Sequence, residues 1–595
     1  MTALPAPLTQ LQHWMLEQEL DLALFPVADR FQGEEMQACD QVVQALSGFD
    51  GSAGYFIATQ QSGVLIVDGR YTVRGQQLAK LYGFELEDLV PGAVGKTLAR
   101  MLGDRKRWTA GVDVMAHDIL QPLIDRTAEQ AEFVPMCDQD VTTWWVQRPR
   151  QAFAPVQRAA ATLSTTTTAE KVKAIWQRVK QDHPSTGCVV VTDPAEIAWL
   201  LNLRGFDTPP LTTFRARLAL QKRGHMLLFR DGPFDGAQLC PDADLAVYPE
   251  SDLPAYLAGM QGQVWINGAS ATYSLVTAIS ADARHTSPNP IQRLKAVKDD
   301  GEIEGMRDAH LDDATAMVRF LHWLESNVAS GNIDEMSAAE KLWSLRTDIG
   351  AYAVSFATIS AVGANAAMPH YRSSSTTNRS LTLDEIYLVD SGGQYDAGTT
   401  DITRTLFFGT PSDAMVRQNT LVLMGHIDVA RARFPRGVTG HQLDSLARQH
   451  LWNAGLDFAH GTGHGVGAGL NVHEAPPTIS ARYLGGSKVP FEPGMVVSNE
   501  PGYYHAGHHG IRIECLQVCQ SVPENTDWLS FDVLTLVPIQ RSLIAPDLMS
   551  DNQLAWMNAY HARVKDAVVP RLNLQSDGPV IDWLIDACKP LIKSK

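Results

Sequence analysis

The chain has 595 residues, 45% of them hydrophobic, and a formal net charge of −17. This length is too great for one hydrophobic core and predicts several domains. The negative charge argues against nucleic acid or an anionic membrane as a main partner. Because no apolar run reaches about 18 residues, no membrane span is expected.

The cysteines and the first residues indicate the compartment. The seven cysteines are few and scattered, as is typical of a reduced, cytoplasmic protein. The opening Met-Thr-Ala-Leu-Pro-Ala-Pro has no basic segment followed by an apolar core, so no signal peptide is expected. Cys515 is interpreted as a packed thiol, because alternation along a strand would turn it away from the neighbouring Glu514.

Residues 1–154 are predicted to form an α/β domain. Its predicted elements are a helix over residues 8–24, strands over residues 55–59 and 63–71, and a helix over residues 71–81. Turn-forming residues separate the first helix from the strands, and a Thr- and Ala-rich tract at residues 159–168 supports a domain boundary nearby.

Residues 155–292 are predicted to repeat this layout as a second domain. The predicted elements are a helix over residues 169–181, a strand over residues 187–193, a helix from residue 196 that ends in a loop, and strands over residues 218–221 and 225–229. The two segments share little sequence, so the repetition is one of layout alone.

A third domain is predicted over residues 293–595. Long helical stretches cover residues 299–328 and 338–346. Thr439 and Gln442 fit a capping box before an apolar helical pattern, and Gly455 suits the end of that helix. The residues beyond Arg541 are interpreted as a C-terminal extension with some helix.

Two aspartates flank a predicted hairpin in this third domain. Asp390 ends one apolar run and Asp401 begins another, with the turn-forming stretch Ser-Gly-Gly-Gln-Tyr-Asp-Ala-Gly-Thr-Thr between them. This pattern predicts two antiparallel strands joined by a glycine-containing loop. Such a hairpin can bring both carboxylates onto one face, where the like charges repel unless a cation lies between them.

Three further candidate ligands follow in glycine-flanked or strand-like settings: His464, Glu500 and Glu514. Four carboxylates and one imidazole suit a hard or borderline divalent cation such as Mn, Co or Zn. Because four negative charges balance two divalent ions, a dinuclear centre is expected. The alternative is a set of unrelated surface carboxylates.

The order of these ligands resembles that of the pita-bread metallopeptidases, a family that includes methionine aminopeptidase, prolidase and aminopeptidase P. The resemblance implies that Asp401 and Glu514 bridge two ions, that Asp390 holds one ion, and that His464 and Glu500 hold the other. Two such ions activate water and polarise the scissile carbonyl. Glu500 is also expected to take a proton.

Five motifs spread along the chain narrow the resemblance to the three-domain form of cytosolic aminopeptidase P. They are Phe49-Asp-Gly-Ser-Ala-Gly, Val67-Asp-Gly-Arg-Tyr, Trp199-Leu-Leu-Asn-Leu-Arg-Gly, Lys295-Ala-Val-Lys and Leu534-Thr-Leu-Val-Pro-Ile. The fold that this resemblance implies is α/β (α+β), with two creatinase-like N-terminal domains before a pita-bread catalytic domain. A homodimer is also implied.

The implied activity is hydrolysis of the bond between an N-terminal residue and a following proline, in short peptides. The expected cofactors are two divalent ions per chain, with Mn as the first choice and Co or Zn as alternatives. An Xaa-Pro dipeptidase, a metal-free creatinase-like hydrolase of a non-peptide C–N bond and a catalytically inactive peptide-binding relative are alternatives. The last two would be expected to have lost metal ligands.

Three histidines are candidates for the chemistry: His370, His460 and His473. Histidine can donate or shuttle a proton near neutral pH. From the residues alone, packed or supporting roles for His460 and His473 are also open. The resemblance assigns His370 and His473 to contact with the substrate and transition state, and His460 to a supporting or substrate-contacting role. The glycines in His460-Gly-Thr-Gly-His464 argue against a helical zinc motif. Pro369 fixes the backbone before His370, where the family motif varies.

Two arginines and a tyrosine are candidates for substrate binding. Arg512 lies two residues before Glu514, on the same face of a strand, and its guanidinium could orient a ligand carboxylate through a bidentate bond. Tyr504 is expected to line the pocket. Arg70 is expected either to reach the substrate or to serve the structure.

His505, His508 and His509 form a histidine-rich stretch in a glycine-containing loop. Because no acidic residue accompanies them there, they are expected to be solvated loop residues.

Overall fold

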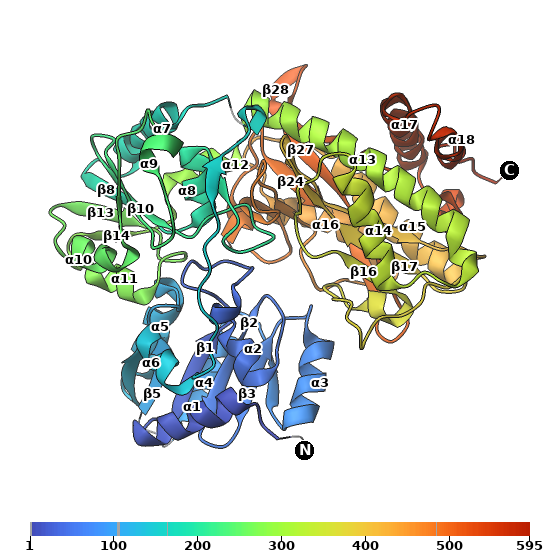
Figure 1. The fold of residues 1–595 in the computed structure, drawn as a ribbon. Coiled ribbons are helices and arrows are strands. Elements are labelled where there is room, and N and C mark those ends of the chain that lie inside the picture. The colour runs from blue at the N-terminus through green and yellow to red at the C-terminus, as the bar shows by residue number, and fades with distance from the viewer. Residues whose placement is uncertain (1–2, 104–106, 164, 484, 595) are drawn as a thin grey trace. The chain divides into compact units, whose positions relative to one another are not determined.

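The computed structural model describes residues 3–103, 107–163, 165–483 and 485–594 (Figure 1). The chain forms two compact units, one of Met1–Arg158 with Thr167–Gln292 and the other of Ala159–Thr166 with Arg293–Lys595. Among the described residues, no helix combines the length and the apolarity needed to cross a bilayer. The predicted boundaries of the three domains stay predictions.

Within the described residues, the first unit contains two six-stranded sheets and a two-stranded pair of β7 (Val156–Arg158) and β9 (Leu203–Gly205). The first sheet has the order β4-β3-β2-β1-β5-β6. Its strands are β1 (Leu22–Pro26), β2 (Gly54–Thr59), β3 (Gly63–Val67), β4 (Glu85–Asp88), β5 (Arg107–Gly111) and β6 (Glu132–Met136). The second sheet has the order β12-β11-β10-β8-β13-β14. Its strands are β8 (Thr186–Val191), β10 (Arg217–Gln221), β11 (Met226–Phe229), β12 (Leu245–Tyr248), β13 (Gln263–Ile266) and β14 (Arg284–Thr286).

The two sheets share one pattern of strand directions. In each, three adjacent central strands pair antiparallel, and the remaining pairs toward both edges are parallel. The repetition of layout predicted from the sequence is therefore present.

Helices cover both faces of the first sheet and bury its alternating side chains. One core contains Phe25 and Leu65 with the helices α1 (Ala6–Glu17), α2 (Val42–Ser47), α3 (Thr72–Tyr82) and α6 (Asp138–Trp144). The other contains Leu24 and Ile66 with α4 (Ala93–Leu102) and α5 (His117–Thr127). Residues 24 and 25 thus point to opposite faces, as the period of a strand requires.

The predicted helix over residues 8–24 is wrong in its second half. Helix α1 ends at Glu17, and Leu22 begins β1. Glu19 adopts the left-handed conformation, with φ of 55°, which ends the helical turn. The apolar residues 20, 22 and 24 alternate, and this period of two belongs to a strand rather than to a helix. The predicted strand from residue 63 likewise ends at Val67, before a turn that closes at Tyr71.

The second unit contains three antiparallel sheets and a separate hairpin, with long helices around them (Figure 1). The first sheet contains β16 (Ile359–Val362), β17 (Tyr387–Ser391) and β20 (Ile402–Leu406), and the second β15 (Ala353–Val354), β18 (Gly393–Tyr395) and β19 (Gly398–Thr399). The largest contains β21 (Arg433–Pro435), β22 (Gly463–Gly465), β23 (Glu474–Ile479), β24 (Val496–Asn499), β27 (Cys515–Val522) and β28 (Asn525–Val533). A separate hairpin joins β25 (Gly502–His505) to β26 (His509–Arg512).

The predicted helices of this unit are present. They are α13 (Asp300–Asn327), α14 (Glu335–Thr347), α16 (Gly440–Trp452), and α17 (Asp551–Val568) with α18 (Gly578–Ala587) in the C-terminal extension, whereas α15 (Asp413–Ala430) was not predicted from the sequence. The Thr439 N–H bonds to Gln442 Oε1 at 2.9 Å, so the predicted capping box before α16 is confirmed. Gly455 has φ of 71°, the left-handed conformation that suits a helix stop.

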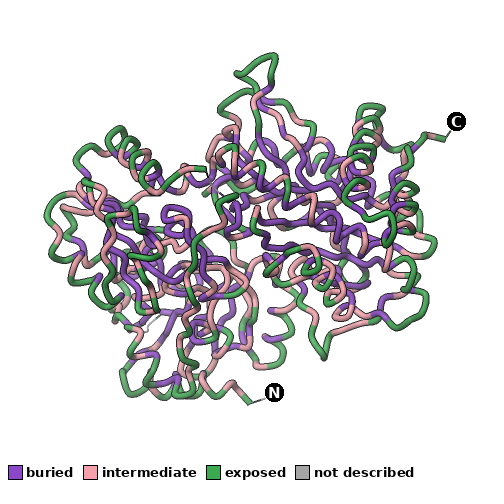
Figure 2. Tube along the Cα trace, turned by 45° about the horizontal axis from the view of Figure 1, so that its top comes forward, coloured by how far each residue is buried: buried purple, intermediate pink, exposed green. Residues whose placement is uncertain are grey.

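The strands of the second unit form its core. Every residue of β17, β20, β24 and β26 is buried. In Figure 2 the buried stretches of the chain run through the interior and the exposed stretches lie at the surface. Polar side chains on these strands are therefore out of water and need internal partners.

The contact between α15 and α16 depends on Gly425. A Cβ at this position would lie 2.1 Å from the Ala447 carbonyl oxygen, so the two helix backbones can approach only because residue 425 is glycine. We predict that Gly425→Ala lowers the midpoint of thermal unfolding. Overpacking costs about 1–3 kcal/mol, which exceeds the roughly 1 kcal/mol by which alanine is the better helix former.

The matched control is Gly578→Ala in α18, where a Cβ would meet no atom within 4 Å. Calorimetry or fluorescence-monitored melting should show an unchanged or higher midpoint for this control. Equal midpoints for the two variants would contradict the proposed helix contact.

Candidate metal centre

The five ligand candidates come from separate segments of the second unit, two of them on strands of different sheets and three in connections between strands. Asp390 lies on β17, Asp401 precedes β20, His464 lies on β22, Glu500 follows β24, and Glu514 lies between β26 and β27. Asp390, Asp401 and Glu514 are buried, and the other two are partly buried. The tertiary structure thus gathers residues that are up to 124 positions apart.

The hairpin places both aspartates on one face. Strands β17 and β20 are antiparallel, with Asp390 opposite Thr403. Asp401 precedes Thr403 by two residues, so all three side chains point to the same side. The predicted hairpin is confirmed, but its connection is not a simple loop, because it contains β18 and β19. The two ends of this connection lie in close backbone contact, because a Cβ on Gly392 would lie 1.9 Å from the Thr400 carbonyl oxygen.

Ligand atoms of Asp401, His464 and Glu514 lie within 4.8 Å of one another. His464 Nε2 is 3.5 Å from Asp401 Oδ2 and 3.5 Å from Glu500 Oε1. The other ring nitrogen, Nδ1, lies 2.9 Å from the Gly465 carbonyl oxygen, which accepts its proton. This hydrogen bond leaves Nε2 to face the carboxylates, the arrangement typical of a histidine that binds a metal.

The carboxyl groups need a cation. Burial raises the pKa of Asp390 to about 7, with Asp401 and Glu500 adding to the shift and Arg512 opposing it. Burial raises the pKa of Glu500 as well, and it raises that of Glu514 well above the ordinary value, with the charge of Asp401 adding in both cases. A divalent ion among these groups would reverse the shifts by stabilising the charged forms.

Two oxygens of the cluster support this conclusion. Asp390 Oδ1 and Asp401 Oδ1 are buried and accept no hydrogen bond from any residue that the structure describes. A buried carboxylate oxygen without a donor is costly unless it coordinates a cation. The residues present therefore fit the ions that the sequence predicts, in ligand type, in charge and in their unused lone pairs.

Arg512 connects the ligands to the rest of the site. Its Nη2 donates to Asp390 Oδ2 at 2.5 Å, its Nη1 to the Tyr504 hydroxyl at 2.7 Å, and its Nε to Thr403 Oγ1 at 3.1 Å. The expected contact with a ligand carboxylate is present, but one nitrogen makes it, and the expected bidentate bond is absent. Strand β26 ends at Arg512, so Glu514 belongs to the connection that follows rather than to the same strand.

Two supporting residues were not predicted from the sequence. Thr403 Oγ1 donates to Glu514 Oε2 at 2.7 Å. Arg404 Nη1 donates to the Glu514 carbonyl oxygen at 2.7 Å, and its Nη2 donates to the Tyr560 hydroxyl of α17 at 3.0 Å. The sequence contained a hint of both residues. Thr403 lies two residues after Asp401, which places both on one face of a strand, and Arg404 is a charged residue within an apolar run. Cys515 is buried at 3.7 Å from Arg404 and Tyr560, as expected for a packed thiol.

Contacts connect two of the candidate histidines and the neighbour of the third to the ligand candidates or to Arg512. The rings of His473 and His464 meet edge to face with centroids 4.3 Å apart, and His473 is exposed on its other side. His460 Nε2 lies 2.8 Å from the Tyr504 hydroxyl, so Tyr504 joins His460 to Arg512. His370 follows Pro369, whose carbonyl oxygen accepts a bond from Arg512 Nη2 at 3.3 Å. The catalytic roles of these histidines stay predictions.

The expectation of a solvated histidine loop is wrong for His509. This residue begins β26 and is 7% exposed, and burial, with the nearby His505 and His508, lowers its pKa to about 4. Its Nε2 bonds to Gln418 Oε1 at 2.9 Å. His505 and His508 are exposed, as expected.

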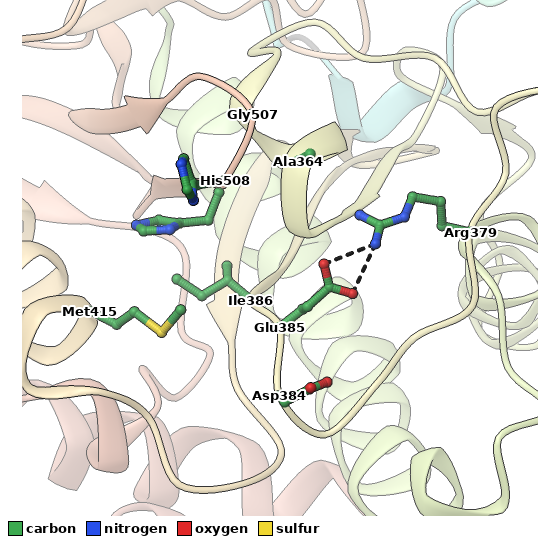
Figure 3. A pocket seen from close by; sticks show the side chains of 9 residues that line it. Ala364, Arg379, Asp384, Glu385, Ile386, Met415, Gly507 and His508 are labelled. Atoms are coloured by element: carbon green, nitrogen blue, oxygen red, sulfur yellow. Dashed lines mark hydrogen bonds and ion pairs between the residues drawn. The ribbon is translucent and has the colours of Figure 1, made fainter.

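A surface pocket of about 410 Å³ lies beside this histidine loop. Figure 3 shows His508 and Met415 on one side of it and the ion pair of Arg379 and Glu385, at 2.9 Å, on the other. None of the five ligand candidates lines this pocket.

Arg70 lies in the first unit. Its Nη2 is 2.7 Å from Asp68 Oδ2, and it lines a cavity of about 380 Å³ with Glu34, Ser52 and Tyr55. This ion pair gives Arg70 a structural role, and its reach to a substrate stays a prediction.

Three sequence models cover most of the chain. Residues 304–520 match metallopeptidase family M24, residues 147–302 match the creatinase/prolidase N-terminal domain, and residues 527–591 match the C-terminal region of peptidase M24. The predicted fold of creatinase-like N-terminal domains followed by a pita-bread domain is thereby confirmed, together with the structural similarity described next.

Relatives match over nearly the whole length. Xaa-Pro aminopeptidase app-1 of Caenorhabditis elegans is 33% identical over 596 residues, which cover 96% of this chain and 95% of that protein. Xaa-Pro aminopeptidase 2 of Sus scrofa is 32% identical over 615 residues, which cover 98% of this chain and 89% of that protein.

Solved structures agree. The crystal structure of X-prolyl aminopeptidase from Caenorhabditis elegans, a cytosolic enzyme with a di-nuclear active site, superposes with a TM-score of 0.90 at 33% identity and covers 96% of this chain and 95% of that chain. An Xaa-Pro dipeptidase from Bacillus anthracis, 23% identical, covers 63% of this chain and 99% of that chain with a TM-score of 0.51, a likeness of fold alone. From the buried ligand cluster and these full-length matches, we conclude that the chain belongs to metallopeptidase family M24, in its Xaa-Pro aminopeptidase group.

Proposed function

We propose that this chain is an Xaa-Pro aminopeptidase that uses two divalent metal ions to hydrolyse the bond between an N-terminal residue and a following proline in short peptides. The observation that carries the proposal is the buried cluster in which His464 Nε2 lies 3.5 Å from carboxylates of both Asp401 and Glu500. The full-length similarity to Xaa-Pro aminopeptidases supports the substrate class.

In this proposal Asp401 and Glu514 would be ligands of both ions, Asp390 of one, and His464 and Glu500 of the other. When bound, the ions supply Lewis acidity and an activated water. Mn is the proposed metal because mixed carboxylate and imidazole ligands suit it, with Co or Zn as alternatives.

The side chains around the ions have distinct roles in the proposal. Arg512 keeps Asp390 charged and oriented through its 2.5 Å hydrogen bond. Glu500 accepts a proton from the attacking water. His473, exposed beside His464, contacts the substrate carbonyl as negative charge develops there, and His370 contacts the substrate as well. Tyr504 holds His460 in place and lines the substrate-binding pocket.

Proline at the second position fits this site chemically. An Xaa-Pro bond is a tertiary amide without an N–H, and the ring fixes the backbone. A pocket shaped for that ring needs no acceptor for an amide proton and can exclude other residues sterically.

Arg70 is proposed to reach the substrate, and the active form is proposed to be a cytoplasmic homodimer.

The alternative functions differ in what they require. A metal-free creatinase-like hydrolase or an inactive peptide-binding relative would be expected to lack metal ligands, whereas all five positions are filled and gathered here. An Xaa-Pro dipeptidase stays an alternative that only substrate length can separate.

We predict that Asp401→Asn removes both metal binding and turnover, because the amide keeps the shape of the side chain but loses the charge that bridges two ions. Mass spectrometric metal analysis should find far fewer than two ions per chain, and peptidase activity should be lost. Asp396→Asn is the matched control, since Asp396 is an exposed carboxylate in the same β-connection. Two ions per chain with full activity in Asp401→Asn would refute the bridging role.

We predict that His473→Ala lowers kcat by roughly 100-fold or more, the usual scale for acid–base and oxyanion groups. Its metal content should stay normal, because His473 meets His464 edge to face and is not assigned as a ligand. His508→Ala, which removes an exposed histidine of the β25–β26 turn, should leave kcat unchanged. A His473→Ala protein without metal would mean that His473 is itself a ligand.

We predict that Arg-Pro-Pro is cut at its first bond much faster than Arg-Ala-Ala, when both are assayed with Mn. Product analysis by liquid chromatography measures the two rates, and an Xaa-Pro dipeptide serves as the third substrate. Equal cleavage of the alanine peptide would indicate a general aminopeptidase. Cleavage of the dipeptide alone would indicate a dipeptidase.

A further inference from the structure

The segment that contains His370 donates hydrogen bonds to a buried carboxylate outside the metal centre. This segment leaves β16 at Val362, makes the short helical turn η5 (Gly363–Ala367), passes through Pro369 and His370, and continues to Arg379. Its two ends lie close together, because Arg379 Nη1 donates to the Val362 carbonyl oxygen at 3.0 Å. Figure 3 shows Ala364 and Arg379 on the same wall of the surface pocket.

Glu335 fills the inside of this segment. It is the first residue of α14 and is fully buried. Its Oε1 accepts from the Val362 N–H at 2.8 Å and from Asn365 Nδ2 at 2.9 Å. Its Oε2 accepts from the Tyr371 hydroxyl at 2.8 Å and from the Arg379 N–H at 3.1 Å.

All four partners of Glu335 donate hydrogen bonds, and all four belong to the segment of His370. A buried carboxylate accepts several such bonds at once, and they are stronger than bonds between neutral groups. An amide could not replace it, because the amide nitrogen would face donors. Glu335 therefore holds both ends and the middle of the segment together.

The opposite side of the segment is fixed by the metal centre itself. Arg512 Nη2 donates to the Pro369 carbonyl oxygen at 3.3 Å and to Asp390 Oδ2 at 2.5 Å. Strand β26 also presses against η5, since a Cβ on Gly510 would lie 1.8 Å from the Ala366 oxygen. His370 thus lies between two anchors, the Pro369 bond on one side and the Tyr371 bond on the other.

We propose that Glu335 is a positioning residue for catalysis, which acts through the Tyr371 hydroxyl to fix His370 beside the metal centre. The inference rests on the proposed function and adds to it a residue that touches neither metal nor substrate. Its effect falls on the catalytic step rather than on metal binding, because a displaced catalytic group loses rate even when the ligands are intact.

The test is a double-mutant cycle with Tyr371→Phe and His370→Ala, in the full-length, metal-loaded protein with Arg-Pro-Pro as substrate. Tyr371→Phe removes one hydroxyl and keeps the ring. We expect kcat to fall about tenfold, as for a misplaced catalytic group, with KM within about twofold and two ions per chain. In the His370→Ala background, Tyr371→Phe should cause no further loss, because a residue that acts through His370 has nothing left to position.

Two further variants sharpen the result. Tyr387→Phe is the matched control, because it also removes a buried hydroxyl, bonded to Ser360 Oγ at 2.7 Å, from the same unit. It should leave kcat unchanged. Glu335→Gln places an amide nitrogen against donors and should lower kcat more than Tyr371→Phe does, again with normal metal content.

The outcomes separate the inference from the function on which it rests. Equal losses from Tyr371→Phe with and without His370, or a Tyr371→Phe enzyme as active as Tyr387→Phe, would overturn the role of Glu335 alone. Wild-type activity in His370→Ala would overturn both that role and the catalytic role proposed for His370.

Discussion

Four carboxylates share one buried region of this protein, and their mutual repulsion is the constraint on which the second unit depends. Like charges out of water are costly unless cations neutralise them. Burial raises the pKa values of Asp390, Glu500 and Glu514, and the charges of the neighbouring carboxylates add to the rise. The strands that hold Asp390 and adjoin Asp401 and Glu500 are buried along their length, so these carboxylates can be kept close together even though their charges repel.

One buried arginine also supplies positive charge to the carboxylates. Arg512 bonds to Asp390, to Tyr504 and to Pro369, and so connects a ligand, the partner of His460 and the segment of His370. The rigid planar guanidinium suits this task, since its donors point in fixed directions. Metal binding and placement of the histidines are therefore coupled through one side chain, whereas Glu335 holds the His370 segment from the other side.

The C-terminal extension also reaches the ligands. Arg404 contacts the backbone of Glu514 and the hydroxyl of Tyr560 on α17, and Tyr560 donates in turn to the Val537 carbonyl oxygen at 2.7 Å. Trp556 of the same helix meets His426 edge to face, and His426 Nδ1 bonds at 3.0 Å to the carbonyl oxygen of Asn499, the residue before Glu500. The extension thus contacts the residues that support two of the candidate ligands, Arg404 beside Glu514 and His426 beside Glu500.

The sequence by itself determined the ligand types, the hairpin of Asp390 and Asp401, the helices of the second unit other than α15, and the repeated layout of the first, because these depend on local periodicity and on the order of motifs. The sequence-based prediction was wrong where a local pattern fits both a helix and a strand, as at Leu22. It was also wrong where burial depends on residues far away in the sequence, as at His509. Only the tertiary structure decided which donor bonds to which acceptor: Thr403 to Glu514, Arg512 to the Pro369 carbonyl oxygen, and Tyr371 to Glu335. Those partners are separated by 36 to 143 residues and are brought together by packing, and no local pattern records such contacts.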